Sequence, residues 1–115
     1  MSTPYEELLA AVTRQRGVAG CLIVSEADGI IVDANVQLGI DAGLVGALVA
    51  SLYRKARLGT EAAGLATVGF LQLEAVGGHL LAAGRDGLVL VTLAEPRAHI
   101  GLIRTAMLQS VGALA

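Results

Sequence analysis

Hydrophobic residues recur along this chain at two spacings, one helical and one extended, and their alternation predicts the order of helices and strands. Residues 3–16 carry apolar positions at helical spacing, with Thr3 as a capping residue. Residues 18–25 are apolar on both faces, which is typical of a central strand. An Asp-Gly turn at 28–29 then leads to a second strand, 30–36, in which apolar and polar residues alternate.

The second half of the chain continues with a helix, three strands and a last helix. A helix is predicted over 42–58, with Asp41 as its N-cap and Gly59 just beyond it. Three strands and a last helix follow, at 66–75, 79–84, 88–94 and 96–114. Tight turns within each group of strands favour antiparallel pairing. The predicted fold class is therefore α+β, a five-stranded antiparallel sheet sandwiched by helices, in one domain of residues 1–115.

The predicted middle helix is apolar over a wider arc than a surface helix needs. Its large apolar residues form two adjoining columns, and a neighbouring sector carries only small residues: Gly43, Gly46, Ala47, Ala50 and Ser51. Small residues three and four apart allow a second backbone to approach closely. The sector could pack on the chain's own sheet, but we favour self-association, because the leucine and valine columns already supply a face for the sheet.

Composition adds a reason to expect a second subunit. Hydrophobic residues make up 55% of the 115 residues and charged residues only 16%, so the excess apolar surface needs a partner, a ligand or a membrane. The longest nearly apolar run, 43–53, is too short to span a bilayer, and we expect no membrane insertion. The acidic N-terminal segment is unlike a signal peptide, which favours a cytoplasmic protein. A net charge of −2 and three aromatic residues do not suit nucleic-acid binding.

The residues that could act in catalysis or bind a metal have no suitable partner residues near them in the sequence. His79 and His99 lack neighbouring metal ligands, and surface or capping roles are expected for both. Cys21 lies in an apolar run and is expected to be a buried thiol. Neither a nucleophile elbow nor a phosphate-binding glycine loop is present in the sequence. We therefore predict no catalytic residue, no metal site and no cofactor.

A basic cluster at the end of the middle helix has two interpretations. Arg54, Lys55 and Arg57 could complement the helix dipole as a solvated rim, or they could form a contact patch for an acidic partner.

The order and spacing of several short motifs resemble the Roadblock/dynein light chain family. The residues that carry this resemblance are Gly17-Val18-Ala19-Gly20-Cys21-Leu22-Ile23-Val24-Ser25, Asp28-Gly29-Ile30-Ile31-Val32, Asp86-Gly87-Leu88-Val89-Leu90-Val91, and residues 95–104. The resemblance implies that the first and last helices cover one face of the sheet and the middle helix covers the other. It also implies dimers in which the third strands pair edge to edge and the middle helices pack side by side. Bacterial members of the MglB type bind Ras-like small GTPases and modulate their nucleotide cycle.

Carried onto this chain, the resemblance gives a non-enzymatic homodimeric regulator or scaffold with a Ras-like small GTPase as its partner. The dimer interface expected from the helix and the third strand comprises Gly43, Leu44, Ala47, Leu48, Ala50, Ser51, Phe70 and Leu71, and the possible GTPase contacts are Arg54, Lys55 and Arg57. The chain departs from the family in carrying little charge on the middle helix and Gly69 within the third strand. It also lacks the extended C-terminal tail of some bacterial members.

One alternative comes from a different class of protein. A small-molecule-binding sensory domain of profilin- or PAS-like architecture would also be a layered α+β sheet. It would need an apolar pocket between sheet and helix, and the polar row Asp33, Asn35 and Gln37 on the second strand is the available set of polar groups.

Overall fold

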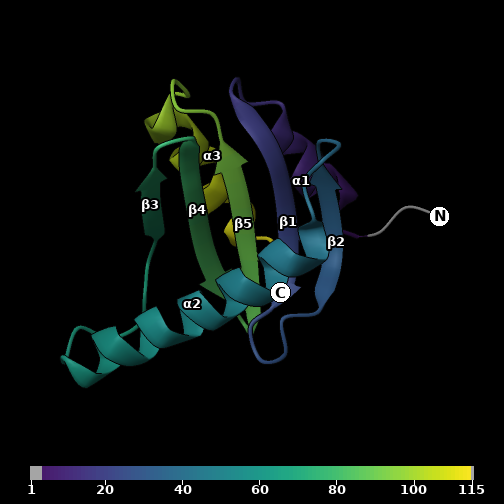
Figure 1. Ribbon diagram of the computed structural model, residues 1–115. Helices are drawn as coiled ribbons and strands as arrows, with labels where there is room; N and C mark the ends of the chain where they lie inside the picture. The colour runs from purple at the N-terminus through teal and green to yellow at the C-terminus, as the bar shows by residue number, and fades with distance from the viewer. Residues whose placement is uncertain (1–3, 115) are drawn as a thin grey trace.

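The computed structural model describes residues 4–114 and shows three helices and five strands in the predicted order. Figure 1 shows these elements, whose bounds are α1 (Glu6–Thr13), β1 (Val18–Ser25), β2 (Ile31–Val36), α2 (Ala42–Ala62), β3 (Leu71–Ala75), β4 (Gly78–Arg85), β5 (Leu88–Ala94) and α3 (Ile100–Val111). The predicted fold class, α+β with order α-β-β-α-β-β-β-α, is confirmed.

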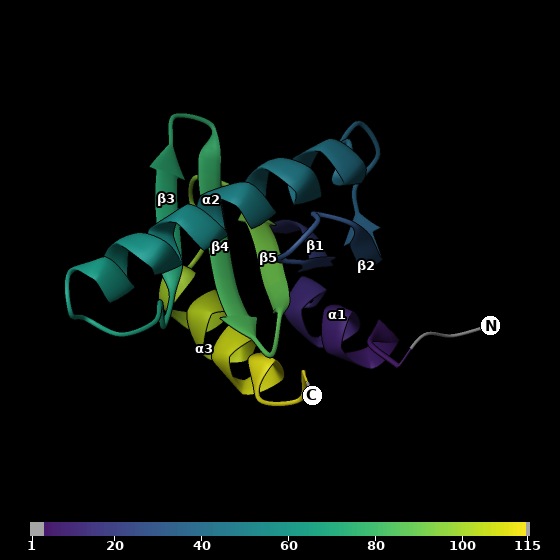
Figure 2. The ribbon, with the colours of Figure 1, turned by 90° about the horizontal axis from the view of Figure 1, so that it is seen from below.

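The five strands form one sheet in the order β2-β1-β5-β4-β3, and all neighbours are antiparallel. Helices α1 and α3 lie on one face and α2 lies on the other, as Figure 2 shows from below. The sheet therefore has two edges, β2 and β3, and separates two hydrophobic cores. The core under α1 and α3 contains Leu9, Val12, Cys21, Ile23, Leu81, Leu90, Ile103, Met107 and Leu114, and the core under α2 contains Leu22, Val24, Val49, Ala50, Tyr53, Ala82, Val89 and Val91.

Helix α2 extends further than predicted, and β3 is shorter. The helix continues through Gly59 to Ala62, because Gly59 does not adopt the positive φ angle with which a glycine commonly ends a helix. Residues 63–70 then form a connection, in which Gly64 and Ala66 adopt positive φ angles of 77° and 65°. Since such angles do not occur in a regular strand, the strand predicted over 66–75 forms only at Leu71–Ala75.

The two terminal helices are also shorter than predicted. Helix α1 begins at Glu6, and Thr3, the expected cap, lies outside the described residues. Helix α3 begins at Ile100, because residues 95–98 form a turn closed by the Ala98 N–H donating to the Glu95 carbonyl at 3.1 Å. The bounds of β1 and β5 agree with the sequence prediction.

Candidate protein interface

The side of α2 that contacts the sheet is built on small residues. Its buried positions are Gly46, Val49, Ala50 and Tyr53. A Cβ placed on Gly46 would lie 2.5 Å from Ile31 Cδ1, so the glycine allows the helix to lie close to β2. The prediction that this small-residue sector faces another subunit is therefore wrong for Gly46 and Ala50, which pack on the chain's own sheet.

The opposite side of α2 is exposed and apolar. Leu44 and Leu48 both have more than half of their surface exposed. Gly43 and Ala47 are exposed as well, and Ser51 is half-buried. These five predicted interface residues therefore remain accessible on α2, at least in part, and only Ala50 of the predicted helix residues is not.

The two predicted interface residues at the start of β3 lie on different faces of the sheet. Leu71 packs against the core under α2. Phe70 packs against the core under α3, where the Arg104 guanidinium lies 5.1 Å from the centre of its ring. The structure therefore brings Leu71, and not Phe70, to the α2 face.

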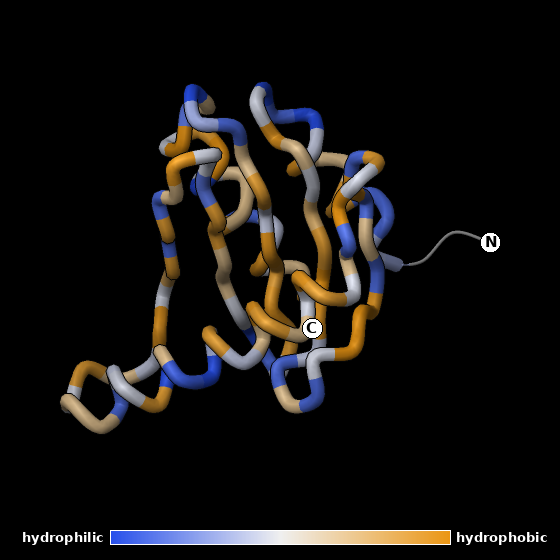
Figure 3. Tube along the Cα trace, viewed as in Figure 1, coloured by the Kyte–Doolittle hydropathy of each residue, from blue (hydrophilic) through white to orange (hydrophobic). Residues whose placement is uncertain are grey.

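Helix α2 crosses one end of the sheet obliquely, and its C-terminal part projects beyond β3, as Figures 1 and 2 both show. Hydrophobic residues continue into this projection (Figure 3). Leu58 and Leu65 are 53% and 71% exposed there. We call residues 58–67 the α2 projection.

The other end of the same sheet face has no helix over it (Figure 1). The strand register places Leu73, Leu80, Leu93, Gly20 and Val36 opposite one another across all five strands. Residues directly opposite in antiparallel strands point to the same face, and Leu80 and Val36 belong to the α2 side. Leu73 is 42% exposed and Leu80, Leu93 and Val36 are half-buried. We call Leu73, Leu80, Leu93 and Val36 the uncovered row.

Sequence analysis did not identify the α2 projection or most of the uncovered row. Leu58 and Leu65 could have been noticed as large apolar residues on either side of Gly59 in a segment rich in glycine and alanine. The uncovered row has no local signal, because its members come from four different strands and meet only through the register of the sheet.

The basic cluster of α2 is largely occupied by contacts within the chain. Arg57 Nε donates to Glu26 Oε1 at 2.8 Å, and Arg57 Nη1 donates to Glu61 Oε1 at 2.9 Å. The hydrogen bond to Glu26, followed by that to Glu61, raises the pKa of Arg57 above its usual value. Arg54 donates to the carbonyls of Glu26 and Ala27 at 3.3 and 3.2 Å. Both arginines therefore fasten the β1–β2 turn to α2, and Lys55 is the member of the cluster left exposed.

The groups most often used in catalysis have structural roles. His99 caps α3, with its Nδ1 accepting from the Leu102 N–H at 3.3 Å, as expected. His79 Nε2 lies 3.2 Å from the Pro96 carbonyl oxygen. Cys21 is buried, and desolvation raises the pKa of its thiol from 9.0 to about 12 despite a hydrogen bond from Thr92.

Groups of three or more potential metal ligands do not occur among residues 4–114. Over the same residues, we find no helix with the length and hydrophobicity needed to cross a membrane.

The space between α2 and the sheet is filled by side chains. A Cβ placed on Gly84 would lie 2.6 Å from the Tyr53 hydroxyl oxygen, which itself donates to the Val68 carbonyl at 3.2 Å. A cleft of about 350 Å³ opens beside this ring, and the charged side chains of Glu26, Arg57 and Asp86 are part of its lining. This arrangement differs from the apolar pocket that a sensory domain would need.

No family model matches the chain. Three uncharacterized proteins of Methanocaldococcus jannaschii are 26%, 26% and 28% identical over 102 residues, which is 89% of this chain and 86–89% of theirs. The names of these three relatives state no function.

Solved structures reveal the class of fold. A Roadblock/LC7 domain from Streptomyces avermitilis has a TM-score of 0.85 at 20% identity, covering 95% of this chain and 92% of that one. The chain therefore has the Roadblock/LC7 fold, in agreement with the resemblance of its motifs. Within this fold it is similar to MglB of Myxococcus xanthus, with a TM-score of 0.84 at 17% identity over 97% of this chain and 94% of MglB. It is also similar to an MglB described as having a tetrameric arrangement, with a TM-score of 0.86 at 20% identity over 100% and 90% of the two chains.

Proposed function

We propose that this chain is a cytoplasmic, non-enzymatic homodimer that binds a Ras-like small GTPase on a platform of two α2 helices. The observation that carries the dimer is the fit between two features of one chain. The α2 projection extends past the β3 edge with exposed leucines, and the uncovered row leaves the same sheet face open behind that edge.

The dimensions of the two features agree. Helix α2 has 21 residues and is about 32 Å long at the usual rise. A five-stranded sheet is about 19 Å wide between its outer strands at the usual spacing. When β3 pairs antiparallel with the β3 of a second copy, the twofold axis carries each α2 projection over the uncovered row of the partner. Both surfaces are then covered reciprocally, as an isologous interface requires.

Burial of these side chains supplies the driving force. Full burial of one leucine stabilises by about 1.5–3 kcal/mol. Leu58, Leu65 and Leu73 have the most surface left to bury and contribute twice in a symmetric pair, whereas the half-buried Leu80 and Leu93 add less. Together they oppose the cost of association. The MglB described as tetrameric shows that a chain with this fold self-associates.

The GTPase part of the proposal is supported by the similarity to MglB and by the exposed outer side of α2. Pairing the helices would place Leu44, Leu48 and Lys55 of both chains on one surface. Arg57 and Arg54 are held by Glu26, Glu61 and two carbonyls. A catalytic arginine supplied to the GTPase would have to leave these partners. We therefore propose that the platform acts indirectly, by holding the GTPase's own switch residues.

Three measurements test this function. Sedimentation equilibrium of the purified chain is expected to give twice the monomer mass at micromolar concentration, and a monomer there would contradict the dimer. Capture from native lysate of the source cells, followed by mass spectrometry, is expected to enrich a small GTPase with the wild type and not with Lys55→Glu.

For the GTPase so identified, its rate of GTP hydrolysis is measured with the wild type and with the double variant Arg54→Lys, Arg57→Lys. Stimulation that survives in the double variant supports the indirect action, and its loss assigns a direct role to the arginines.

A further inference from the structure

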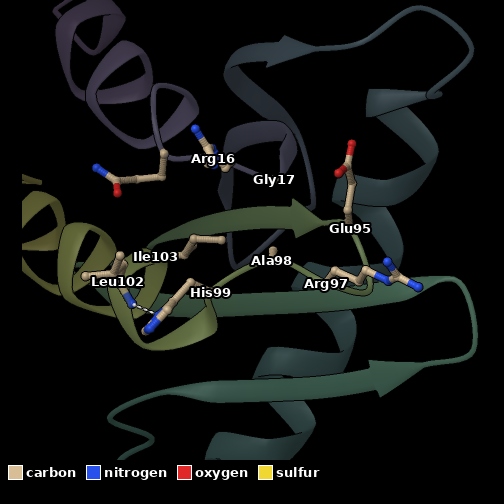
Figure 4. Close-up of a pocket in the computed structure, with 9 residues that line it drawn as sticks. Arg16, Gly17, Glu95, Arg97, Ala98, His99, Leu102 and Ile103 are labelled. Atoms are coloured by element: carbon tan, nitrogen blue, oxygen red, sulfur yellow. Dashed lines mark hydrogen bonds between the residues drawn. The ribbon is translucent and has the colours of Figure 1, made fainter.

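A cleft lies on the face of the sheet opposite α2, where the end of α1 meets the start of α3 (Figure 4). Its volume is about 450 Å³, and it is lined by residues 15–17, residues 95 and 97–99, and the first turn of α3. This volume lies within the range of sites that bind small ligands or short peptide segments. We call it the α1–α3 cleft.

The walls of the α1–α3 cleft are fixed by backbone contacts. Gly17 has a φ of +89°, and a Cβ placed on it would lie 2.6 Å from Ala98 Cβ, so the two chain segments are in direct contact. The Glu95 N–H donates to the Gly17 carbonyl at 2.8 Å and joins the same segments. A cleft held in this way is formed before any partner binds, which lowers the entropic cost of binding.

The floor of the cleft is apolar and open at one point. Ile103 is buried in the core beneath it, whereas Leu102 is 58% exposed. Leu102 therefore offers an uncovered apolar surface inside a concave site.

The rim of the cleft carries positive side chains that no group among residues 4–114 is seen to pair with. Within residues 4–114, four cationic side chains have no hydrogen bond, ion pair or ring contact: Arg14, Arg16, Lys55 and Arg97. Arg16 and Arg97 line the cleft, and Arg14 is two residues away from Arg16. Two of the four therefore line this one cleft, in a chain whose net charge is −2. The Glu95 carboxylate, the acidic group of the lining, points away from α3 (Figure 4).

We propose that the α1–α3 cleft binds an acidic peptide segment of a partner protein, with an apolar side chain on Leu102 and carboxylates beside Arg16 and Arg97. Figure 4 shows the two arginines extending to different sides of the cleft rather than toward one point. A compact anion such as phosphate would meet one of them, whereas an extended segment passes both. The apolar floor also favours a ligand that has side chains of its own.

The location of the cleft gives the protein two separate binding faces. The α1–α3 cleft and the α2 platform lie on opposite sides of the sheet (Figure 2), so both can be occupied at once. The inference does not depend on the dimer or on the GTPase, because every residue of the cleft belongs to one chain.

Fluorescence anisotropy with a short fluorescein-labelled peptide of alternating glutamate and leucine tests the proposal on the full-length chain. We expect saturable binding that weakens as sodium chloride is raised. The double variant Arg16→Gln, Arg97→Gln is expected to weaken binding about tenfold or more, as is Leu102→Ala. The matched controls are Arg85→Gln, an exposed arginine elsewhere, and Leu108→Ala, an exposed leucine further along α3. Both controls should bind as the wild type does.

Several outcomes would overturn the proposal. These are absence of binding, equal binding of a glutamine-and-leucine peptide, or equal losses in the two controls. Full displacement of the peptide by inorganic phosphate, at a concentration where chloride of the same ionic strength has no effect, would show a simple anion site instead. All substituted residues are exposed, so unchanged circular dichroism is expected to show that each variant remains folded.

Discussion

The two edges of the sheet, β2 and β3, differ in how they are protected against another strand. The register of β2 with β1 is interrupted by a bulge between Ile23 and Val24, and the Asn35 side chain donates to Thr13 of α1 at 3.4 Å. Asp33 also places a charge within β2. Bulges and inward charges are devices that keep an edge from pairing. β3 pairs with β4 without interruption from Leu71 to Ala75, and four of its five residues are exposed.

The surroundings of an edge strand, more than its own sequence pattern, therefore decide whether it can pair with another strand. Residues 32–36 of β2 alternate between apolar and polar, which is the pattern of a good edge for pairing. It is nevertheless closed by the bulge and by α1. β3 is shorter and contains Glu74, but nothing covers its outer side, and α2 leaves its upper end free (Figure 1).

The largest effect is expected when a charge is placed on the open edge. Leu73→Arg should raise the dissociation constant of the dimer about 100-fold, since it puts a charge where the α2 projection of the partner would pack. Val32→Arg on β2 is the matched control, because Val32 and Leu73 are both 42% exposed. Sedimentation velocity over a range of concentrations measures both constants. Equal dissociation of the two variants would contradict the difference between the edges.

An intermediate effect is expected when the segment leading to β3 loses its anchor. In Gly84→Ala the new methyl group would displace the Tyr53 ring and break its hydrogen bond to the Val68 carbonyl. We expect a loss of about 2 kcal/mol in the free energy of unfolding by urea. Gly59→Ala is the control, because a Cβ there meets open space in a helix, and it should be neutral or slightly stabilising. Equal stability of both variants would show that Tyr53 does not hold this segment.

The smallest effect concerns Cys21 of β1, the strand next to the β2 edge, whose side chain is buried under α1 and α3. The raised pKa of Cys21, about 12 against 9.0, means that the unfolded chain loses the thiol proton first as pH rises. The stabilisation is complete below pH 9 and is lost progressively toward pH 12. At pH 10 it should have fallen by about 1.4 kcal/mol. Chemical denaturation between pH 8 and 10 should therefore show a steeper decline in the free energy of unfolding for the wild type than for Cys21→Ala. Parallel curves would mean that the thiol is hydrated in the folded chain.

Much of the fold could be predicted from the sequence, because the central strands carry strong local signals. β1 and β5 are apolar on both faces and adjoin Asp-Gly turns, so their bounds were predicted correctly. β3 was predicted too long, since the positive φ of Ala66 reflects the geometry of the connection and not a preference of alanine. The end of α2 was predicted too early, because a glycine in open space weakens a helix without ending it.

The candidate surfaces were harder to predict, because their contacts are distant in the sequence. Glu26 and Arg57 are 31 residues apart, and the sequence near either residue does not predict their ion pair. The small residues of α2 correctly predicted that another segment approaches the helix closely. At Gly46, however, that segment is β2 of the same chain and not a second subunit. The α1–α3 cleft joins segments about 80 residues apart in the chain and was not predicted.

The α2 projection has a consequence for the cell that makes this protein. In the proposed pair, neither chain alone completes the platform, so the amount of platform obeys mass action. At levels below the dissociation constant, it grows with the square of the protein's abundance, and halving synthesis removes three quarters of it. Expression alone would then regulate docking, with no chemical modification of the chain.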